Sequence, residues 1–129
     1  MDLSILIIDN DQVNSFVLRN IITRNYPKAK VHLCADGVDG FEYLEKLERD
    51  QSQFPTVILL DIYMPIKDGF EFLEDYSKRF EQKPTVIFAM SNSLDKNDQK
   101  RANEFNMVRG FITKPLIYNN IQFIVDSLR

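Results

Sequence analysis

The residues of this chain best suited to chemistry follow short apolar runs. They are an acid–amide pair, an acid, a hydroxyl and a lysine: Asp9 and Asn10, Asp61, Ser91 and Lys114. An aspartate can act as a nucleophile toward phosphorus and form an acyl phosphate. Two neighbouring carboxylates repel each other unless a cation lies between them, and Mg²⁺ prefers such oxygen ligands. If these residues converge, they predict metal-assisted phosphoryl transfer to a carboxylate, with the lysine neutralising charge on the phosphate.

The apolar pattern of the chain alternates between two kinds of segment. Dense runs rich in Ile, Val, Leu and Phe are typical of strands buried on both faces, and they lie at residues 3–8, 31–34, 56–60, 85–90 and 110–113. Amphipathic stretches with helical spacing lie between and after these runs, at residues 13–24, 41–47, 70–80 and 117–128. The remaining stretch, 95–106, is polar and predicts the least apolar of five helices. Strand and helix in alternation predict a parallel sheet with helices on both faces.

Five strand–helix units indicate an α/β fold, a flavodoxin-like (βα)5 doubly wound parallel sheet with strand order 2-1-3-4-5. Half of a Rossmann fold would instead need a glycine-rich turn after the first strand, and residues 9–12 contain no glycine. In the flavodoxin-like order, the strand order reverses between strands one and three. Ligand sites form at this switch point, at the carboxyl ends of the strands. The polar residues after the strands are therefore expected to meet in one crevice.

Composition and charge limit the class of protein. With 129 residues, 44% of them hydrophobic, and no linker, residues 1–129 are expected to form one domain with no output domain. A net charge of -3 provides no basic face for nucleic acid. The single cysteine excludes an internal disulfide, and the sequence has neither a signal peptide nor an apolar stretch of about 18 residues. We expect a soluble, cytoplasmic protein with no membrane partner.

Motifs at four strand ends resemble those of one protein family. The first motif is residues 5–11, an apolar run that ends in an acidic turn, and the second is residues 57–69, which contains Asp61, Met64-Pro65 and Asp68-Gly69. The third is Ser91, and the fourth is the run Phe111-Ile112-Thr113-Lys114-Pro115. From end to end the chain resembles the receiver domain of two-component response regulators. The resemblance implies a stand-alone regulator in a bacterial phosphorelay, with a histidine kinase or a phosphotransfer domain as its phosphoryl donor.

Within this resemblance, Asp61 is the phospho-acceptor and Lys114 is the lysine that pairs with the phosphate. Asp9 and Asn10 match the pair that holds Mg²⁺, and the backbone carbonyl of Tyr63 completes the metal site together with Asp61. The crevice has no evident base to speed hydrolysis. We therefore expect a signalling protein rather than an enzyme, with at most slow autophosphorylation and autodephosphorylation.

The resemblance also assigns a switch. Ser91 matches the switch hydroxyl and Phe111 the switch aromatic, and we favour Ser91 over Ser93 in the same strand-to-helix loop. Phosphorylation would draw Ser91 toward the phosphate and let Phe111 rotate. The surface of the fifth strand with the fourth and fifth helices would change as a result and select a downstream protein target.

Other properties follow from the same resemblance. Phosphoryl donors are expected to dock on the exposed side of the first helix, near Asn14, Ser15 and Leu18. The bond between Lys114 and Pro115 is expected to be cis. The protein is expected to be a monomer or a weak dimer.

One residue departs from the family pattern, because Asn10 stands where a second acid is usual. An amide oxygen can coordinate Mg²⁺ but brings no charge, so weaker Mg²⁺ binding is predicted. Asp11 could compensate only by turning inward, and it is expected to cap the first helix instead. In that helix Val13 and Phe16 are among the apolar residues at helical spacing.

Two other functions stay open from the sequence. A degenerate receiver would bind partners without phosphorylation, and Asn10 is the feature in its favour. A flavodoxin-like redox carrier would need a hydroxyl- and glycine-rich loop after the first strand, where Asp9 and Asp11 would repel a flavin phosphate. His32, the only histidine, is expected beside the second strand and away from the crevice, and Cys34 is expected to be a small buried hydrophobic residue.

Overall fold

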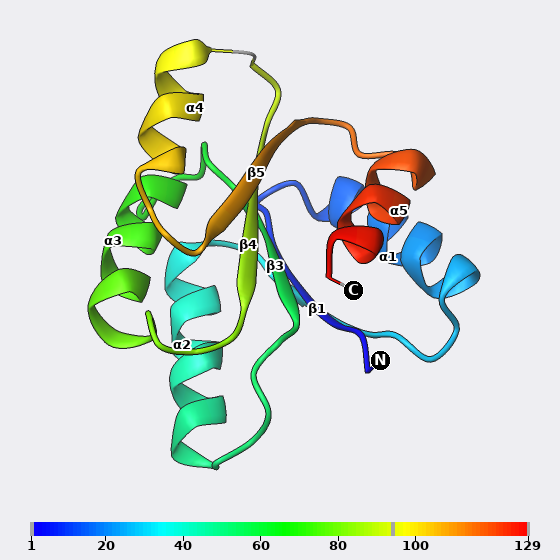
Figure 1. The fold of residues 1–129 in the computed structure, drawn as a ribbon, viewed down its shortest axis with the longest axis horizontal. Coiled ribbons are helices and arrows are strands. Elements are labelled where there is room, and N and C mark those ends of the chain that lie inside the picture. Colours follow the sequence, from blue (N-terminus) through cyan, green and yellow to red (C-terminus); the bar gives the residue numbers. More distant parts are fainter. Residues whose placement is uncertain (1, 94, 129) are drawn as a thin grey trace.

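The computed structural model describes residues 2–93 and 95–128, and it shows five parallel strands, each followed by a helix (Figure 1). In chain order the elements are β1 (Ser4–Ile8), α1 (Gln12–Asn25), β2 (Lys30–Cys34), α2 (Gly37–Arg49), β3 (Val57–Asp61), α3 (Gly69–Arg79), β4 (Val86–Ser91), α4 (Lys96–Asn103), β5 (Val108–Thr113) and α5 (Tyr118–Ser127). The sheet order β2-β1-β3-β4-β5 confirms the predicted doubly wound α/β fold.

The ends of some elements differ from the prediction. Strand β5 begins at Val108, ahead of the predicted start. The prediction missed its first residues because most of the strand is only partly buried and does not form a dense apolar run. The polar segment is indeed a helix, α4, in which Ala102 is the single buried residue. Across the described parts of the chain, no helix combines the length and apolar character that crossing a bilayer requires.

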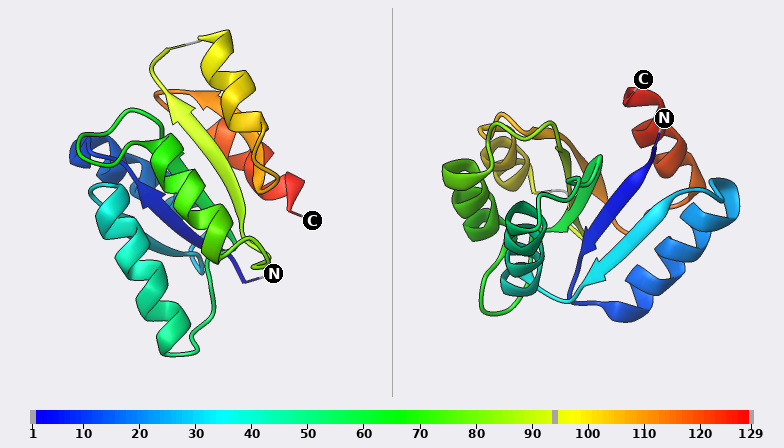
Figure 2. Two further views of the ribbon diagram at one scale, coloured as in Figure 1. Left: turned by 90° about the vertical axis from the view of Figure 1, so that its left-hand side faces the viewer. Right: turned by 90° about the horizontal axis from the view of Figure 1, so that it is seen from below.

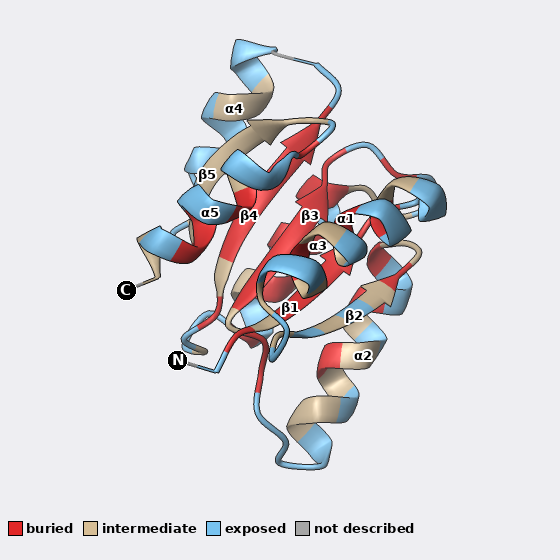
Figure 3. Ribbon diagram, turned by 90° about the vertical axis from the view of Figure 1, so that its right-hand side faces the viewer, coloured by how far each residue is buried: buried red, intermediate tan, exposed pale blue. Residues whose placement is uncertain are grey.

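Two apolar cores lie on opposite faces of the sheet (Figures 1 and 3). Successive residues of a strand point to opposite faces, so each strand contributes to both cores. Leu6 and Ile58 pack with residues of α2 and α3, whereas Ile5 and Val57 pack with residues of α1 and α5. All five residues of β3 are buried. The strand that carries Asp61 is therefore the most enclosed part of the domain.

Aspartate side chains fix the start of four helices, where backbone N–H groups lack partners within the helix. These caps are Asp11, Asp36, Asp68 and Asp95. The expectation that Asp11 caps the first helix is confirmed, since its Oδ1 accepts from the backbone N–H of Asn14 at 3.0 Å. Asp11 is thereby engaged at the helix end rather than in the crevice.

Helix α1 presents an apolar stripe to solvent. Val13, Phe16 and Val17 are 76%, 51% and 50% exposed, whereas Ser15 and Leu18 face the sheet and are buried. The expectation that Ser15 and Leu18 lie on an exposed docking side is therefore wrong. Helical periodicity puts these two residues on the packed side of α1 and the apolar stripe on the free side.

Candidate functional site

Three charged side chains meet at the carboxyl end of the sheet. Asp9 follows β1, Asp61 ends β3 and Lys114 follows β5. The Nζ atom of Lys114 lies 2.9 Å from Oδ2 of Asp9 and 3.5 Å from Oδ2 of Asp61. All three side chains are almost fully buried. Because β1 and β3 are adjacent parallel strands, their carboxyl ends place the two acids side by side.

The electrostatics of this cluster follow from two buried carboxylates sharing one ammonium. The pKa of Asp61 is raised to about 6, first by burial and then by hydrogen bonding to Asp9 and the charge of Asp9. The charge of Lys114 opposes the rise without cancelling it. Burial alone would lower the pKa of Lys114, but its contacts with Asp9 and Asp61 outweigh burial and raise it. The cluster therefore keeps an excess of negative charge that a cation would stabilise.

The carboxylate of Asp9 is held from three directions. Its Oδ1 accepts from the backbone N–H of Asp11 at 2.9 Å, and its Oδ2 accepts from Nδ2 of Asn14 at 3.2 Å as well as from Lys114. The contact with Asn14 was not foreseen from the sequence. The feature of the sequence that could have indicated this contact is the position of Asn14 in the first turn of α1, shortly after the end of β1. These bonds fix the orientation of one candidate metal ligand.

The loop after β3 is pinned against the acceptor strand. The backbone N–H of Tyr63 donates to Oδ1 of Asp61 at 3.1 Å, and the N–H of Gly69 donates to the carbonyl of Ile62 at 2.8 Å. A Cβ atom at Gly69 would lie 2.8 Å from the carbonyl oxygen of Asp61 and 2.7 Å from Cα of Ile62. Only glycine lets the start of α3 approach the acceptor so closely.

The oxygen donors of the site fit a hard cation such as Mg²⁺. Asp9 and Asp61 supply two adjacent carboxylates, and Asn10 is exposed at the rim. No group of three or more His, Cys, Asp or Glu side chains suited to a metal occurs in residues 2–93 and 95–128. Position 10 carries an amide, and Asp11 is engaged as the cap of α1. Mg²⁺ commonly uses only one or two carboxylates and completes its shell with water and phosphate oxygens.

Comparison with known proteins identifies the family. A family model for the response regulator receiver domain matches residues 5–126. The chain belongs to the response regulator receiver family. Similar solved structures include a two-component response regulator from Cytophaga hutchinsonii, with 25% identity, a TM-score of 0.89 and coverage of 99% of this chain and 98% of that one. A two-component response regulator from Legionella pneumophila is 21% identical, with a TM-score of 0.84 and 98% coverage of both chains.

A third similar structure is the chemotaxis protein CheY4 of Vibrio cholerae, with 19% identity, a TM-score of 0.75 and full coverage of both chains. At these identities the Legionella and Vibrio proteins support the fold alone. No curated protein matches the sequence.

The residues expected to form the switch of this receiver lie on the two strands that follow the acceptor strand in the sheet, β4 and β5. Ser91 ends β4, next to β3 in the sheet, and is fully buried. Its Oγ accepts from the backbone N–H of Ser93 at 3.0 Å, whereas the exposed Ser93 accepts from the N–H of Asp95 at the start of α4. Phe111 is half-buried and packs at the edge of a small cluster that includes Ala89. Their switching roles stay predictions.

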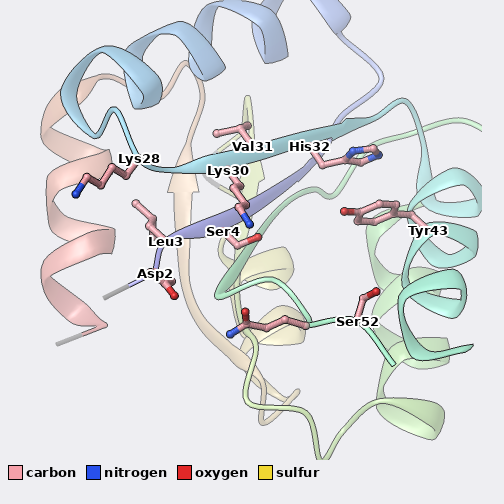
Figure 4. Close-up of a pocket in the computed structure, with 10 residues that line it drawn as sticks. Asp2, Leu3, Ser4, Lys28, Lys30, Val31, His32, Tyr43 and Ser52 are labelled. Carbon is pink, nitrogen blue, oxygen red and sulfur yellow. The ribbon is translucent and has the colours of Figure 1, made fainter. Parts of the chain in front are cut away.

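Three further expectations are met in this receiver. The bond between Lys114 and Pro115 is cis. Cys34 is buried, and burial raises the pKa of its thiol to about 12, so the thiol stays protonated. His32 lies on β2 and stacks on Tyr43 with ring centroids 3.9 Å apart. Figure 4 shows both rings beside a pocket of about 460 Å³ that also contains Ser4 from the start of β1 and is separate from the acceptor cluster.

Proposed function

We propose that this receiver accepts a phosphoryl group on Asp61 from a histidine kinase or a phosphotransfer domain, in a reaction that depends on Mg²⁺. The observation that carries the proposal is the buried cluster in which Lys114 contacts both Asp9 and Asp61. A surface aspartate at a strand end would need neither the buried lysine nor a second carboxylate. The family membership of the chain supports the same chemistry.

The residues divide the chemistry between them. A carboxylate oxygen of Asp61 forms the new bond to phosphorus while the bond from phosphorus to the donor histidine nitrogen breaks. Lys114 offsets the negative charge on the transferring group. Asp9, Asp61, the side chain of Asn10 and the carbonyl of Tyr63 would hold Mg²⁺, which supplies further charge neutralisation when bound. With an amide at position 10, its affinity for the site is expected to be weak.

The consequence of phosphorylation is a change of surface rather than catalysis of another reaction. Ser91 moves toward the phosphate, Phe111 rotates inward, and the face formed by α4, β5 and α5 selects a downstream protein target. Autophosphorylation from small donors and autodephosphorylation are expected to be slow. The phosphorylated state then persists long enough to be recognised.

The phosphoryl donor is expected to dock on the apolar stripe of α1. Val13, Phe16 and Val17 are exposed and apolar, and they belong to the helix whose first turn holds Asp9 through Asn14. An exposed apolar stripe of this kind is typical of a protein–protein contact. A partner seated there would bring its phosphohistidine to the end of the sheet where Asp61 lies. We further propose that the protein is cytoplasmic and that it is a monomer or a weak dimer. Light scattering on the purified protein would measure the oligomeric state.

Intact mass spectrometry after incubation with acetyl phosphate and Mg²⁺ tests the proposal. The wild type should gain the mass of one phosphoryl group, and the gain should disappear with EDTA and in Asp61→Asn. Glu42→Gln, on the exposed side of α2, is a matched control that should phosphorylate normally. An unmodified wild type that still binds partners would instead establish the degenerate receiver, for which Asn10 is the argument.

A further inference from the structure

Helix α4 is attached to the domain by few side chains. Its single buried residue, Ala102, packs against Ile62 and Phe70, and the guanidinium of Arg101 lies over the ring of Phe70 at 4.0 Å. Ile62 and Phe70 both belong to the segment that runs from the acceptor strand into α3. In Figure 1 and in the left view of Figure 2, α4 (yellow) lies on the same side of the sheet as α3 (green). The same cluster contains Ala89 of β4, with Val108 and Phe111 of β5 packed against it, so α4 rests both on β4 and β5 and on the segment directly after Asp61.

Tyr63 joins that segment to α4 through its side chain. Its phenol donates a hydrogen bond to Oδ2 of Asp98, in the first turn of α4. In this contact the phenol hydroxyl is the donor and the carboxylate oxygen the acceptor. The residue is 56% exposed, so burial does not hold its side chain in place. The hydrogen bond to Asp98 is the contact that gives the side chain a defined position.

The same residue also touches the acceptor through its backbone. The N–H of Tyr63 donates to Oδ1 of Asp61, and the loop is fixed on either side of Tyr63 by backbone bonds of Ile62 and Gly69. One residue thus contacts Asp61 with its backbone and Asp98 with its side chain. On the β4 side, the N–H of Ile62 donates to the carbonyl of Met90 at 3.0 Å, so the loop is anchored to β4 directly before Tyr63.

We propose that Tyr63 is a positioning residue that transmits the state of Asp61 to α4 through its two hydrogen bonds. This inference rests on the proposed phosphorylation of Asp61. Forming an acyl phosphate removes the charge that both carboxylate oxygens share and makes them weaker acceptors, so the bond from the N–H of Tyr63 changes. Because the loop is held at both ends, the change passes to the phenol and to Asp98. This route differs from the one through Ser91 and Phe111 because it uses the hydrogen bond between Tyr63 and Asp98.

The contact itself is tested first, without phosphate. Hydrogen–deuterium exchange of the α4 amides is measured in the wild type, Tyr63→Phe, Asp98→Ala and the double variant. Each single variant should speed exchange by about fivefold, as expected for one hydrogen bond, and the double variant should be no faster than either. Tyr118→Phe, which removes the hydroxyl of another exposed tyrosine, at the start of α5, should leave α4 unchanged. Additive effects of the two substitutions, or no effect, would overturn the proposal.

The transmission is tested with beryllium fluoride and Mg²⁺, a mimic of the phosphorylated state, by backbone amide chemical shifts. In the wild type, shifts should change both at Ser91 and across α4. In Tyr63→Phe the change at Ser91 should remain and the change across α4 should shrink by at least about half. A purely structural role for the hydroxyl would lower stability in urea but leave the α4 response intact, and that result would overturn the proposal. A wild type that does not respond at all would instead refute the proposed phosphorylation, and the inference with it.

Discussion

Replacing Asp61 with asparagine is expected to stabilise the fold at neutral pH. Burial and the neighbouring Asp9 raise the pKa of Asp61 from 3.8 to about 6. A rise of about two pKa units at roughly 1.4 kcal/mol each sets an upper bound near 3 kcal/mol, and solvent screening reduces the expected gain to about 1–2 kcal/mol. Asparagine removes the charge and keeps an oxygen that can accept the N–H of Tyr63.

The sign of the pH dependence follows from proton binding. The folded state binds this proton more tightly than the unfolded chain, so stability falls as the pH rises from about 4 to about 6. Above about pH 6, Asp61 is ionised and its full cost to the free energy of unfolding is present. The stabilisation by Asp61→Asn should therefore be complete at neutral pH and fade below about pH 4.

Urea unfolding of the wild type and Asp61→Asn in EDTA, at about pH 7.5 and about pH 4, measures the difference in the free energy of unfolding. Glu42→Gln, a charge-neutralising change on the exposed side of α2, controls for net charge. Excess Mg²⁺ should reduce the difference in the free energy of unfolding between the two proteins at neutral pH, because the cation stabilises the ionised carboxylate of the folded wild type. An Asp61→Asn variant that is no more stable than the wild type at neutral pH in EDTA would refute the reasoning.

Three more outcomes follow from the site. Asn10→Asp should tighten Mg²⁺ binding by about tenfold or more, since it restores a charged ligand, and equal affinities in a Mg²⁺ titration followed by tyrosine fluorescence would contradict this. Lys114→Gln should lower the free energy of unfolding at neutral pH by about 3 kcal/mol, because two buried carboxylates lose their counter-charge, and urea unfolding measures it. Gly69→Ala should destabilise the fold by about 2 kcal/mol and slow phosphorylation, because the new Cβ would press on the backbone of Asp61 and Ile62. Normal stability and phosphorylation of Gly69→Ala would show that the loop has room to relax.

The order of elements and the place of the acids could be predicted because they depend on local pattern. Dense apolar runs mark strands buried on both faces, and the parallel arrangement then brings Asp9, Asp61 and Lys114 to one edge of the sheet. The start of β5 at Val108 was missed because a partly buried strand has no dense apolar run. The cap at Asp11 was predicted because aspartate before a helix has a specific hydrogen-bonding role.

Contacts that depend on side-chain direction could not be predicted. The apolar spacing of Val13 and Phe16 indicates an amphipathic helix but does not say which side packs, and in α1 the buried side contains Ser15. The hydrogen bond from Tyr63 to Asp98 joins residues on different elements and has no local sequence signal. Such long-range pairs are settled by packing rather than by spacing along the chain.

The most direct measurement of the central claim locates the phosphoryl group on the chain. After incubation with acetyl phosphate and Mg²⁺, borohydride reduces an acyl phosphate and converts the modified aspartate to homoserine, which peptide mass mapping identifies. The account predicts homoserine at position 61, dependent on Mg²⁺. Homoserine at Asp9 or another acid, or none in a wild type whose intact mass shows phosphorylation, would contradict the assignment of Asp61 as the acceptor.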